Sequence, residues 1–137
     1  MSHHLLIDTL EAHNEVRQAE GKPPLNWCQE CAQSAQEHAD ELARSGEILH
    51  GNLCDSHAHM GQNIAIGGKA FNVKKAVDSW MQEKISYNDR GKQCGHYTQV
   101  VWRGTTHVGV GVARMGNKTI LVANYHPPGN MPSQFCL

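Results

Sequence analysis

The sequence has little of three things: long apolar runs, charge imbalance and aromatic side chains. No stretch approaches the roughly 20 apolar residues that a membrane-spanning helix needs, and residues 1–4 show neither a secretion signal nor a myristoylation site. Hydrophobic residues make up 39% and charged residues 18%, with a formal net charge of -1, so neither disorder nor a nucleic-acid surface is indicated. We expect one soluble domain with its own core.

Cysteines are few and odd in number. The five are Cys28, Cys31, Cys54, Cys94 and Cys136, so at least one is free or pairs between chains. Cys28 and Cys31 form a Cys-x-x-Cys motif, which is typical of redox sites and of zinc sites. No second such motif accompanies it and no β-α-β pattern surrounds it. We therefore expect this pair to serve packing or to bond to cysteines elsewhere.

Apolar residues at helical spacing predict three helices. The first covers about residues 5–19, and the second runs from about Cys28 to Arg44 with Gly46 as its C-cap. The third is capped by Asn72 and carries a regular apolar stripe. Residues 49–61 lie between the second and third helices. They are polar and rich in histidine, and their length favours a functional loop over a simple turn.

The last third of the chain is rich in β-branched residues. These predict three strands, over 97–102, 108–114 and 119–125. Gly116-Asn117 joins the last two as a tight hairpin. Gly109, Gly111 and Ala113 leave one face of the middle strand almost bare, so a helix can pack closely there. Helices followed by antiparallel strands indicate an α+β fold in which helices cover the sheet.

Two residues stand out as candidates for a functional site. Glu83 falls seven residues after Ala76 and three after Trp80, which places a carboxylate on the apolar face of the third helix. Burial of an unpaired carboxylate is unfavourable, so either the helix end frays into water or a cationic group meets Glu83. His96 follows Gly95 at the start of the first predicted strand, where a rigid backbone would orient its ring toward a site.

Four segments, in the correct order, resemble patterns of the CAP superfamily, which includes cysteine-rich secretory proteins, insect antigen five and plant pathogenesis-related proteins. They are Ala12–Arg17, Gly61–Ala65, Gly95–Trp102 and Asn124–Asn130. The resemblance implies a single CAP domain over residues 1–137. It also implies an α-β-α sandwich, with an antiparallel sheet of about three strands covered by helices on both faces.

The resemblance leaves the cellular location open. Many secreted relatives carry a cysteine pair at positions resembling Ala113 and Ala123 of this chain. The absence of that pair is closest in character to the Golgi-associated pathogenesis-related type or to bacterial relatives. The protein is therefore either secreted, with its signal already removed, or intracellular, and no transmembrane segment is expected.

The resemblance further implies a shallow groove that holds two histidines and two acidic residues. His96 matches the histidine of the first signature, and Glu83 matches the acid at the end of the third helix. The second acid is expected at position 62, where this chain has Gln62. For the other histidine His50 fits best, and it has two rivals in the same loop: His57 and His59.

His50 and His96 are the predicted metal ligands. Imidazoles bind Zn²⁺ or Cu²⁺, and a carboxylate such as Glu83 orients the ring. Without the resemblance the signal is weak, because the separation of the two histidines matches no metal-binding motif. Gln62 lacks a charge, so we expect weak zinc binding, little activation of water and no need of metal for folding. A structural hydrogen bond or salt bridge between Glu83 and His96 is the alternative.

These features favour a non-enzymatic binding module. Proteins similar to this one bind sterols, fatty acids or other lipids, and some self-associate. The resemblance thus implies a lipid or sterol ligand, with a membrane surface or a second copy as further partners. Three apolar side chains of a glycine-hinged stretch could flank the lipid, unless this stretch is an ordinary core-facing loop: Ile64, Ile66 and Phe71.

The alternative function is a metal-assisted or Ser/His-type hydrolase, such as a peptidase. That chemistry asks for a nucleophile beside a base that an acid orients. Ser45, Ser56 and Thr98 are the candidate nucleophiles. No Gly-x-Ser-x-Gly pattern surrounds any of them, so we expect the protein not to be an enzyme.

Overall fold

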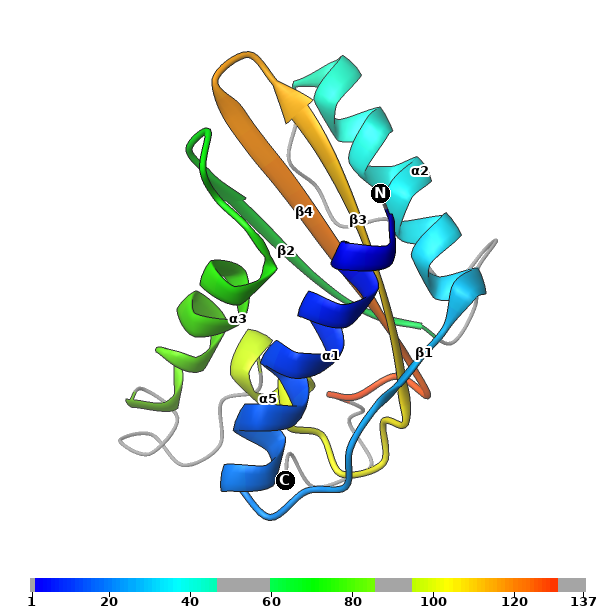
Figure 1. The fold of residues 1–137 in the computed structure, drawn as a ribbon, viewed down its shortest axis with the longest axis vertical. Coiled ribbons are helices and arrows are strands. Elements are labelled where there is room, and N and C mark those ends of the chain that lie inside the picture. The colour runs from blue at the N-terminus through cyan, green and yellow to red at the C-terminus, as the bar shows by residue number, and fades with distance from the viewer. Residues whose placement is uncertain (1, 47–59, 86–94, 131–137) are drawn as a thin grey trace.

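The computed structural model describes residues 2–46, 60–85 and 95–130, which form a sheet between two layers of helices (Figure 1). The elements are α1 (Ser2–Ala19), β1 (Asn26–Trp27), α2 (Gln29–Ser45), β2 (Gly61–Gly67), α3 (Val73–Met81), α5 (His96–Val100), β3 (His107–Met115) and β4 (Lys118–His126). The strand order is β1-β3-β4-β2, with β1 parallel to β3 and the other pairs antiparallel. Among the described helices, none is long and apolar enough to cross a membrane.

Helix α2 covers one face of the sheet by direct contact with its backbone. A Cβ atom at Gly109 would lie 2.7 Å from the Cα of Ala32, and one at Gly111 would lie 2.7 Å from the carbonyl carbon of Ala35. The helix ends where the sequence predicts, at Gly46 with a φ of 76°. A helix therefore packs closely on the glycine face of β3, as the sequence predicts.

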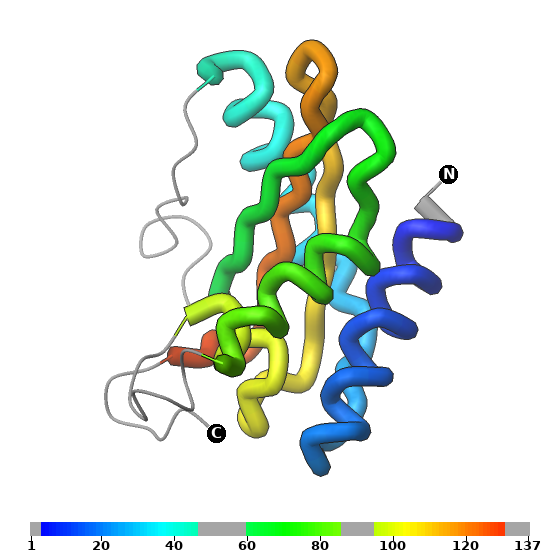
Figure 2. The backbone as a smooth tube through the Cα atoms, turned by 90° about the vertical axis from the view of Figure 1, so that its left-hand side faces the viewer, coloured from blue at the N-terminus to red at the C-terminus, as the bar shows by residue number. Residues whose placement is uncertain are grey.

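Helices α1, α3 and α5 cover the opposite face, and α1 and α3 run beside each other (Figure 2). This layer encloses the guanidinium of Arg17, which is completely buried. Burial lowers the pKa of Arg17 to about 10, so the group keeps its charge at neutral pH. Its nitrogens donate to four carbonyl oxygens, at 2.7–3.2 Å, those of Pro23, Val100, Trp102 and Thr105. One side chain thus fixes the segment that follows α5 against α1.

The prediction of a strand over 97–102 is wrong, because residues 96–100 form the short helix α5. Tyr97, Thr98, Gln99 and Val100 are all buried, so the run is covered on every side. A short run of this kind has no periodicity that separates a buried strand from a buried helix. The amide of Gly95 donates to the Thr98 hydroxyl at 2.7 Å, which closes the first turn.

The described part of the sheet has four strands, one more than expected. The α+β class and the sandwich with helices on both faces are confirmed, as are the three long helices and the β3–β4 hairpin. Since one predicted strand is helix α5, two of the four strands were not predicted. They are β1, which is only two residues long, and β2, which pairs with β4 from Gly61 to Gly67. Glycines at both ends of β2 hide its strand character in the sequence.

The expectation that Cys28 and Cys31 bond to cysteines elsewhere is also wrong. The two residues form a disulfide with each other, at the start of α2. Cys28 is the N-cap of that helix, and its Sγ accepts a hydrogen bond from the Cys31 amide at 3.0 Å. The three-residue separation is short enough for this because the first helical turn brings N-cap and N3 together.

Candidate functional site

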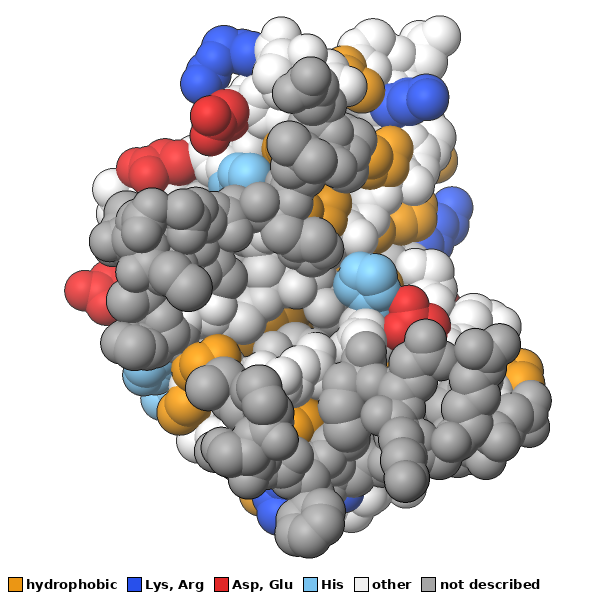
Figure 3. Space-filling view, turned by 180° about the vertical axis from the view of Figure 1, so that it is seen from behind, with side chains coloured by type: hydrophobic (Ala, Val, Ile, Leu, Met, Phe, Trp, Pro, Cys, Tyr) orange, Lys and Arg blue, Asp and Glu red, His pale blue; other side chains and the backbone are white. Residues whose placement is uncertain are grey.

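Glu83 and His96 form a hydrogen-bonded pair at the surface, between the end of α3 and the start of α5. Glu83 Oε2 lies 2.7 Å from His96 Nδ1, and Oε1 accepts the Tyr97 amide at 3.1 Å. A carboxylate only accepts, so Nδ1 carries the proton. The Trp80 ring stacks against the imidazole, with centroids 6.2 Å apart and planes at 11°. Seen from behind relative to Figure 1, the surface in Figure 3 shows a histidine and an acidic side chain in contact.

This geometry answers the question that the sequence leaves open about Glu83. Its carboxylate does not meet water alone, because the imidazole of His96 and a backbone amide both donate to it. The orientation of His96 comes from Glu83 and not from a strand, since His96 is the first residue of α5. The side chains of His96 and Glu83 remain 34% and 42% exposed, so both lie at the protein surface.

A chain of buried hydrogen bonds supports His96 from the core. Asn63 Nδ2 donates to the His96 carbonyl at 3.1 Å and to the Tyr125 hydroxyl at 3.5 Å. Tyr125 donates to His13 Nε2 at 2.7 Å, and His13 Nδ1 donates to the Thr9 carbonyl at 2.9 Å. Burial lowers the pKa of His13 to about 4 and raises that of Tyr125, so both stay neutral at pH 7.

Sequence reasoning missed Asn63 as a positioning residue. The residue is 1% exposed and stands on β2, directly after Gln62. A polar residue within the Gly61–Ala65 segment was the signal that could have found it. His13 and Tyr125 are completely buried, so their part in this chain of hydrogen bonds is structural.

Gln62 points to the other face of β2, because neighbouring residues of a strand alternate. Its Nε2 donates to Asn124 Oδ1 at 3.1 Å, and Asn124 in turn donates to the Cys31 carbonyl of the α2 layer. The hydrogen bonds of the described residues therefore join Glu83 to His96 and Gln62 to Asn124. His50 and its two rivals, His57 and His59, lie outside the described residues.

The three apolar residues expected at a lipid groove do not share one surface. Ile64 packs into the core beneath α2, whereas Phe71 packs into the core of the opposite face. A Cβ atom at Gly67 would overlap the Phe71 ring, so the ring lies directly over this glycine. Ile66 is 36% exposed at the sheet edge. The stretch is an edge strand followed by a turn into α3.

An open pocket lies between α1 and the end of α3. Its volume is about 470 Å³, and it combines three apolar with three polar side chains: Val16, Met81, Ile85, Asp78, Gln82 and Lys84. Ile85 is 66% exposed, the highest value among the large apolar residues that the structure describes. Lys84 Nζ bonds Glu20 at 2.6 Å. Sequence reasoning missed this pocket, although Ile85 just beyond the third helix was a visible signal.

The hydroxyl of Thr98 is engaged in local structure. It accepts the Gly95 amide, and its one proton has two acceptors within reach, the Gly95 carbonyl at 2.9 Å and Asn130 Oδ1 at 2.6 Å. Ser45 donates to the Leu42 carbonyl at 3.5 Å within α2. Ser56 lies outside the described residues. In ranges 2–46, 60–85 and 95–130, no three His, Cys, Asp or Glu side chains converge as a metal site.

Comparison with known protein families decides the relationship. The model of the CAP family, described as the cysteine-rich secretory protein family, matches residues 10–125. The chain belongs to this family. It is 40% identical over 131 residues to pathogenesis-related protein 1A of Nicotiana tabacum, covering 90% of this chain and 75% of that protein. It is 37% identical over 130 residues to pathogenesis-related leaf protein 4 of Solanum lycopersicum, covering 90% and 77%.

Solved structures share this CAP fold at lower sequence identity. The crystal structure of NaASP2 with Zn²⁺ superposes with a TM-score of 0.81 at 22% identity, covering 99% of this chain and 86% of that one. Venom allergen-like protein 4 of Schistosoma mansoni gives a TM-score of 0.71 at 25% identity, covering 92% and 89%. These similarities support the layered arrangement of helices and sheet.

Proposed function

We propose that this CAP domain is a non-enzymatic binding module that takes one lipid, a fatty acid or a sterol, in the pocket between α1 and α3. The observation that carries the proposal is the pocket itself, whose volume of about 470 Å³ falls in the range of small-molecule sites. Val16, Met81 and Ile85 provide an apolar lining, and the polar residues stand around it.

The exposure of Ile85 supports a ligand at this position. Its large apolar side chain is 66% exposed beside a concave surface. Covering it with an apolar ligand removes apolar surface from water, which favours binding. Lys84 adds a cation at the pocket, held by Glu20, which an acidic headgroup could engage in place of Glu20. A fatty acid would use this cation and a sterol would not.

The contacts around His96 support binding rather than hydrolysis. A nucleophile must lie beside its base, but the Thr98 hydroxyl is hydrogen-bonded within the turn that starts α5 and to Asn130. The Glu83–His96 pair instead has the form of an imidazole that a carboxylate orients.

A second function, weak binding of Zn²⁺, is favoured by one observation. With the proton on Nδ1 toward Glu83, His96 presents Nε2 as the ligating nitrogen, as in carboxylate–histidine–zinc arrangements. We propose His50 as the other ligand. NaASP2, a structural neighbour, was crystallised with Zn²⁺. Bound zinc would supply a Lewis acid at the surface.

Titration of palmitate and of cholesterol tests the lipid proposal, with fluorescence displacement as the readout. Ile85→Glu places a charge in the pocket and is expected to weaken binding at least tenfold, about 1.4 kcal/mol. Ile7→Glu is the matched control, because Ile7 is also exposed, at 44%, but does not line the pocket. Equal weakening by both variants, or saturable binding of neither lipid, would contradict the proposal.

Calorimetry with Zn²⁺ tests the metal separately. His96→Ala should abolish the binding heat, whereas Gln62→Glu should leave it unchanged, because Gln62 points to the other face of β2. Lipid affinity should not change in either variant. Equal zinc heats for wild type and His96→Ala would rule out this ligand.

A further inference from the structure

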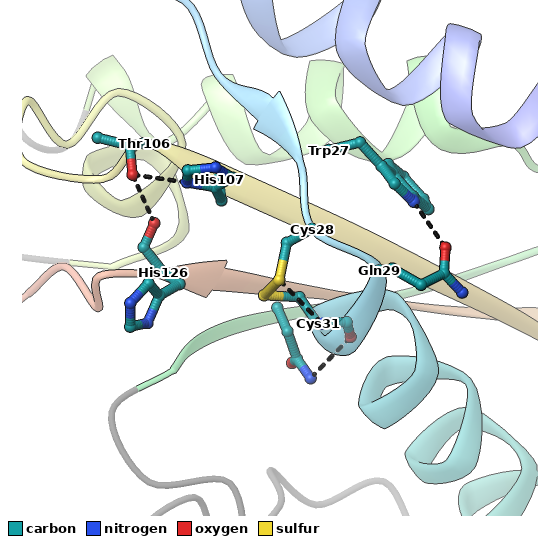
Figure 4. The surroundings of a disulfide bond; sticks show 8 residues. Trp27, Cys28, Gln29, Cys31, Thr106, His107 and His126 are labelled. Carbon is teal, nitrogen blue, oxygen red and sulfur yellow. Dashed lines mark hydrogen bonds between the residues drawn. A yellow bond between two sulfur atoms is a disulfide. The ribbon is translucent and has the colours of Figure 1, made fainter.

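The disulfide between Cys28 and Cys31 lies apart from the site described above, where β1 meets the N-terminus of α2 (Figure 4). β1 ends at Trp27 and α2 starts at Gln29, so the pair is held between a strand and a helix of 17 residues. The Cys28 amide donates to the Val108 carbonyl of β3 at 2.9 Å. The backbone around the first cysteine is therefore fixed independently of the disulfide.

The two cysteines differ in their access to solvent. Cys31 is 0% exposed beneath the first turn of α2, whereas Cys28 is partly exposed at the N-cap. Thiol–disulfide exchange begins when a thiolate reaches one sulfur of a disulfide, so access decides which sulfur is attacked. Cys28 is the partly exposed residue of the pair, so we expect an incoming thiolate to attack its sulfur.

The start of α2 favours an anion at Cys28. The amide of Cys31 already donates to Cys28 Sγ at 3.0 Å, and the positive end of the helix dipole lies at this terminus. When the disulfide opens, the same amide can stabilise a Cys28 thiolate, which is the nucleophilic form of cysteine. The Cys31 amide can thus donate to Cys28 Sγ both in the disulfide and in the thiolate.

Two histidines flank the disulfide on the surface. His107 and His126 pair across β3 and β4, in the surroundings of the disulfide (Figure 4). They lie on the α2 face, because Asn124, two residues before His126, donates to the Cys31 carbonyl. His107 Nδ1 lies 2.7 Å from the Thr106 hydroxyl. One carboxylate stands in the first turn of α2, that of the exposed Glu30.

We propose that Cys28–Cys31 is a redox-active disulfide that exchanges with thiols of a partner. A partner thiolate attacks Cys28 Sγ, forms a mixed disulfide and displaces Cys31 as a thiolate, which takes up a proton. A second partner thiol then attacks the mixed disulfide and releases Cys28. The partner loses two electrons and two protons in becoming a disulfide, and the Cys28–Cys31 pair gains them. The reverse reaction oxidises the pair.

The test uses the full chain in glutathione buffers of increasing reducing strength, followed by alkylation and peptide mass analysis, which reads each cysteine separately. We expect Cys28–Cys31 to open and close reversibly while circular dichroism stays native. Under these conditions Cys28 should be alkylated at least about tenfold faster than Cys31. Opening only in denaturant, or equal alkylation rates, would overturn the proposal. These outcomes need no variant.

A matched pair of variants locates the attacked sulfur. Cys31→Ser should retain glutathione as a mixed disulfide on Cys28, whereas Cys28→Ser should not trap it on the buried Cys31. Trapping on Cys31 alone, or on neither, would contradict the assignment. A parallel experiment replaces glutathione with reduced thioredoxin, which is a protein dithiol. The class of partner that the disulfide uses, a protein dithiol or a small thiol, should reduce it faster.

Discussion

On the α2 side the sheet presents glycines to the helix, whereas on the side of α1, α3 and α5 the space between helices and sheet holds buried polar side chains. On the α2 face, Gly109 and Gly111 let backbone contact backbone. On the opposite face, Arg17, His13 and Asn63 are buried and hydrogen-bonded. The first face depends mainly on close backbone contact, and the second depends on hydrogen-bond geometry and on protonation as well.

The difference explains where the candidate binding groups lie. On the α2 face, the helix lies directly on the strand backbone at Gly109 and Gly111 and leaves little space above them. The other face holds His96 through Asn63 and leaves a pocket between α1 and α3. We therefore expect changes at the glycine contact to affect stability alone, and changes on the opposite face to affect stability, pH response and binding together.

The largest effect should come from filling the glycine contact under α2. Gly111→Val places a branched side chain against the backbone of Gln36 and Ala35, which cannot move without displacing the helix. We expect a loss of about 4 kcal/mol or more in unfolding free energy, measured by urea denaturation. Gly68→Ala is the control, since nothing lies within 4 Å of a Cβ there. Similar losses in both variants would remove the close contact as the cause.

Replacement of the buried guanidinium on the other face should rank second. Arg17→Met keeps the apolar stem but leaves four carbonyl oxygens without their donor. The expected loss is about 3 kcal/mol. Arg17→Lys should recover only part of this stability, because one ammonium group cannot donate to all four carbonyl oxygens as the forked guanidinium does. Full recovery with lysine would show that charge, not geometry, matters here.

The pH response should separate the two faces. His13 has a folded-state pKa of about 4 against an ordinary 6.5, so between these values the unfolded chain binds more protons. Stability is full above pH 6.5 and falls as the pH decreases toward 4, by about 2 kcal/mol between pH 7.5 and pH 5. Denaturation of wild type and His13→Gln over this range measures the difference. An unchanged slope in the variant would exclude His13 as its source.

Removal of the Tyr125 hydroxyl should have the smallest effect. Tyr125→Phe keeps the buried ring but deprives His13 Nε2 of its donor, and we expect a loss of about 1 kcal/mol. The same variant frees Asn63, so the amide signal of Tyr97 beside Glu83 should shift in NMR spectra. An unmoved Tyr97 signal would limit the hydrogen-bond chain to a structural role.

The sequence predicts most of the α2 face and part of the opposite one. Helical periodicity, the Gly46 cap and the alternating glycines of β3 are local signals, and they locate α2 on the sheet. The position of Glu83 on an apolar helix face leaves two outcomes, a frayed helix end or a cationic partner, and the structure shows the partner. Its identity as His96 follows from the resemblance and from the fold, because 13 residues separate the two.

The remaining features depend on tertiary contacts that leave no local pattern. Helix α5 is short and buried on all sides, so its residues favour a strand until the Thr98 turn is known. Asn63 gains its role only when β2 pairs with β4 and brings it to Tyr125. The pocket between α1 and α3 requires two helices that are distant in sequence, and neither helix encodes it alone.

Methyl NMR during titration with palmitate tests the central claim, that the pocket between α1 and α3 is the binding site. We expect the methyl signals of Val16, Met81 and Ile85 to shift and to saturate at one lipid per chain, while those of Ile120 and Val122, in the core beneath α2, stay in place. Shifts confined to Ile120 and Val122, or unchanged pocket methyls at saturating palmitate, would contradict the account.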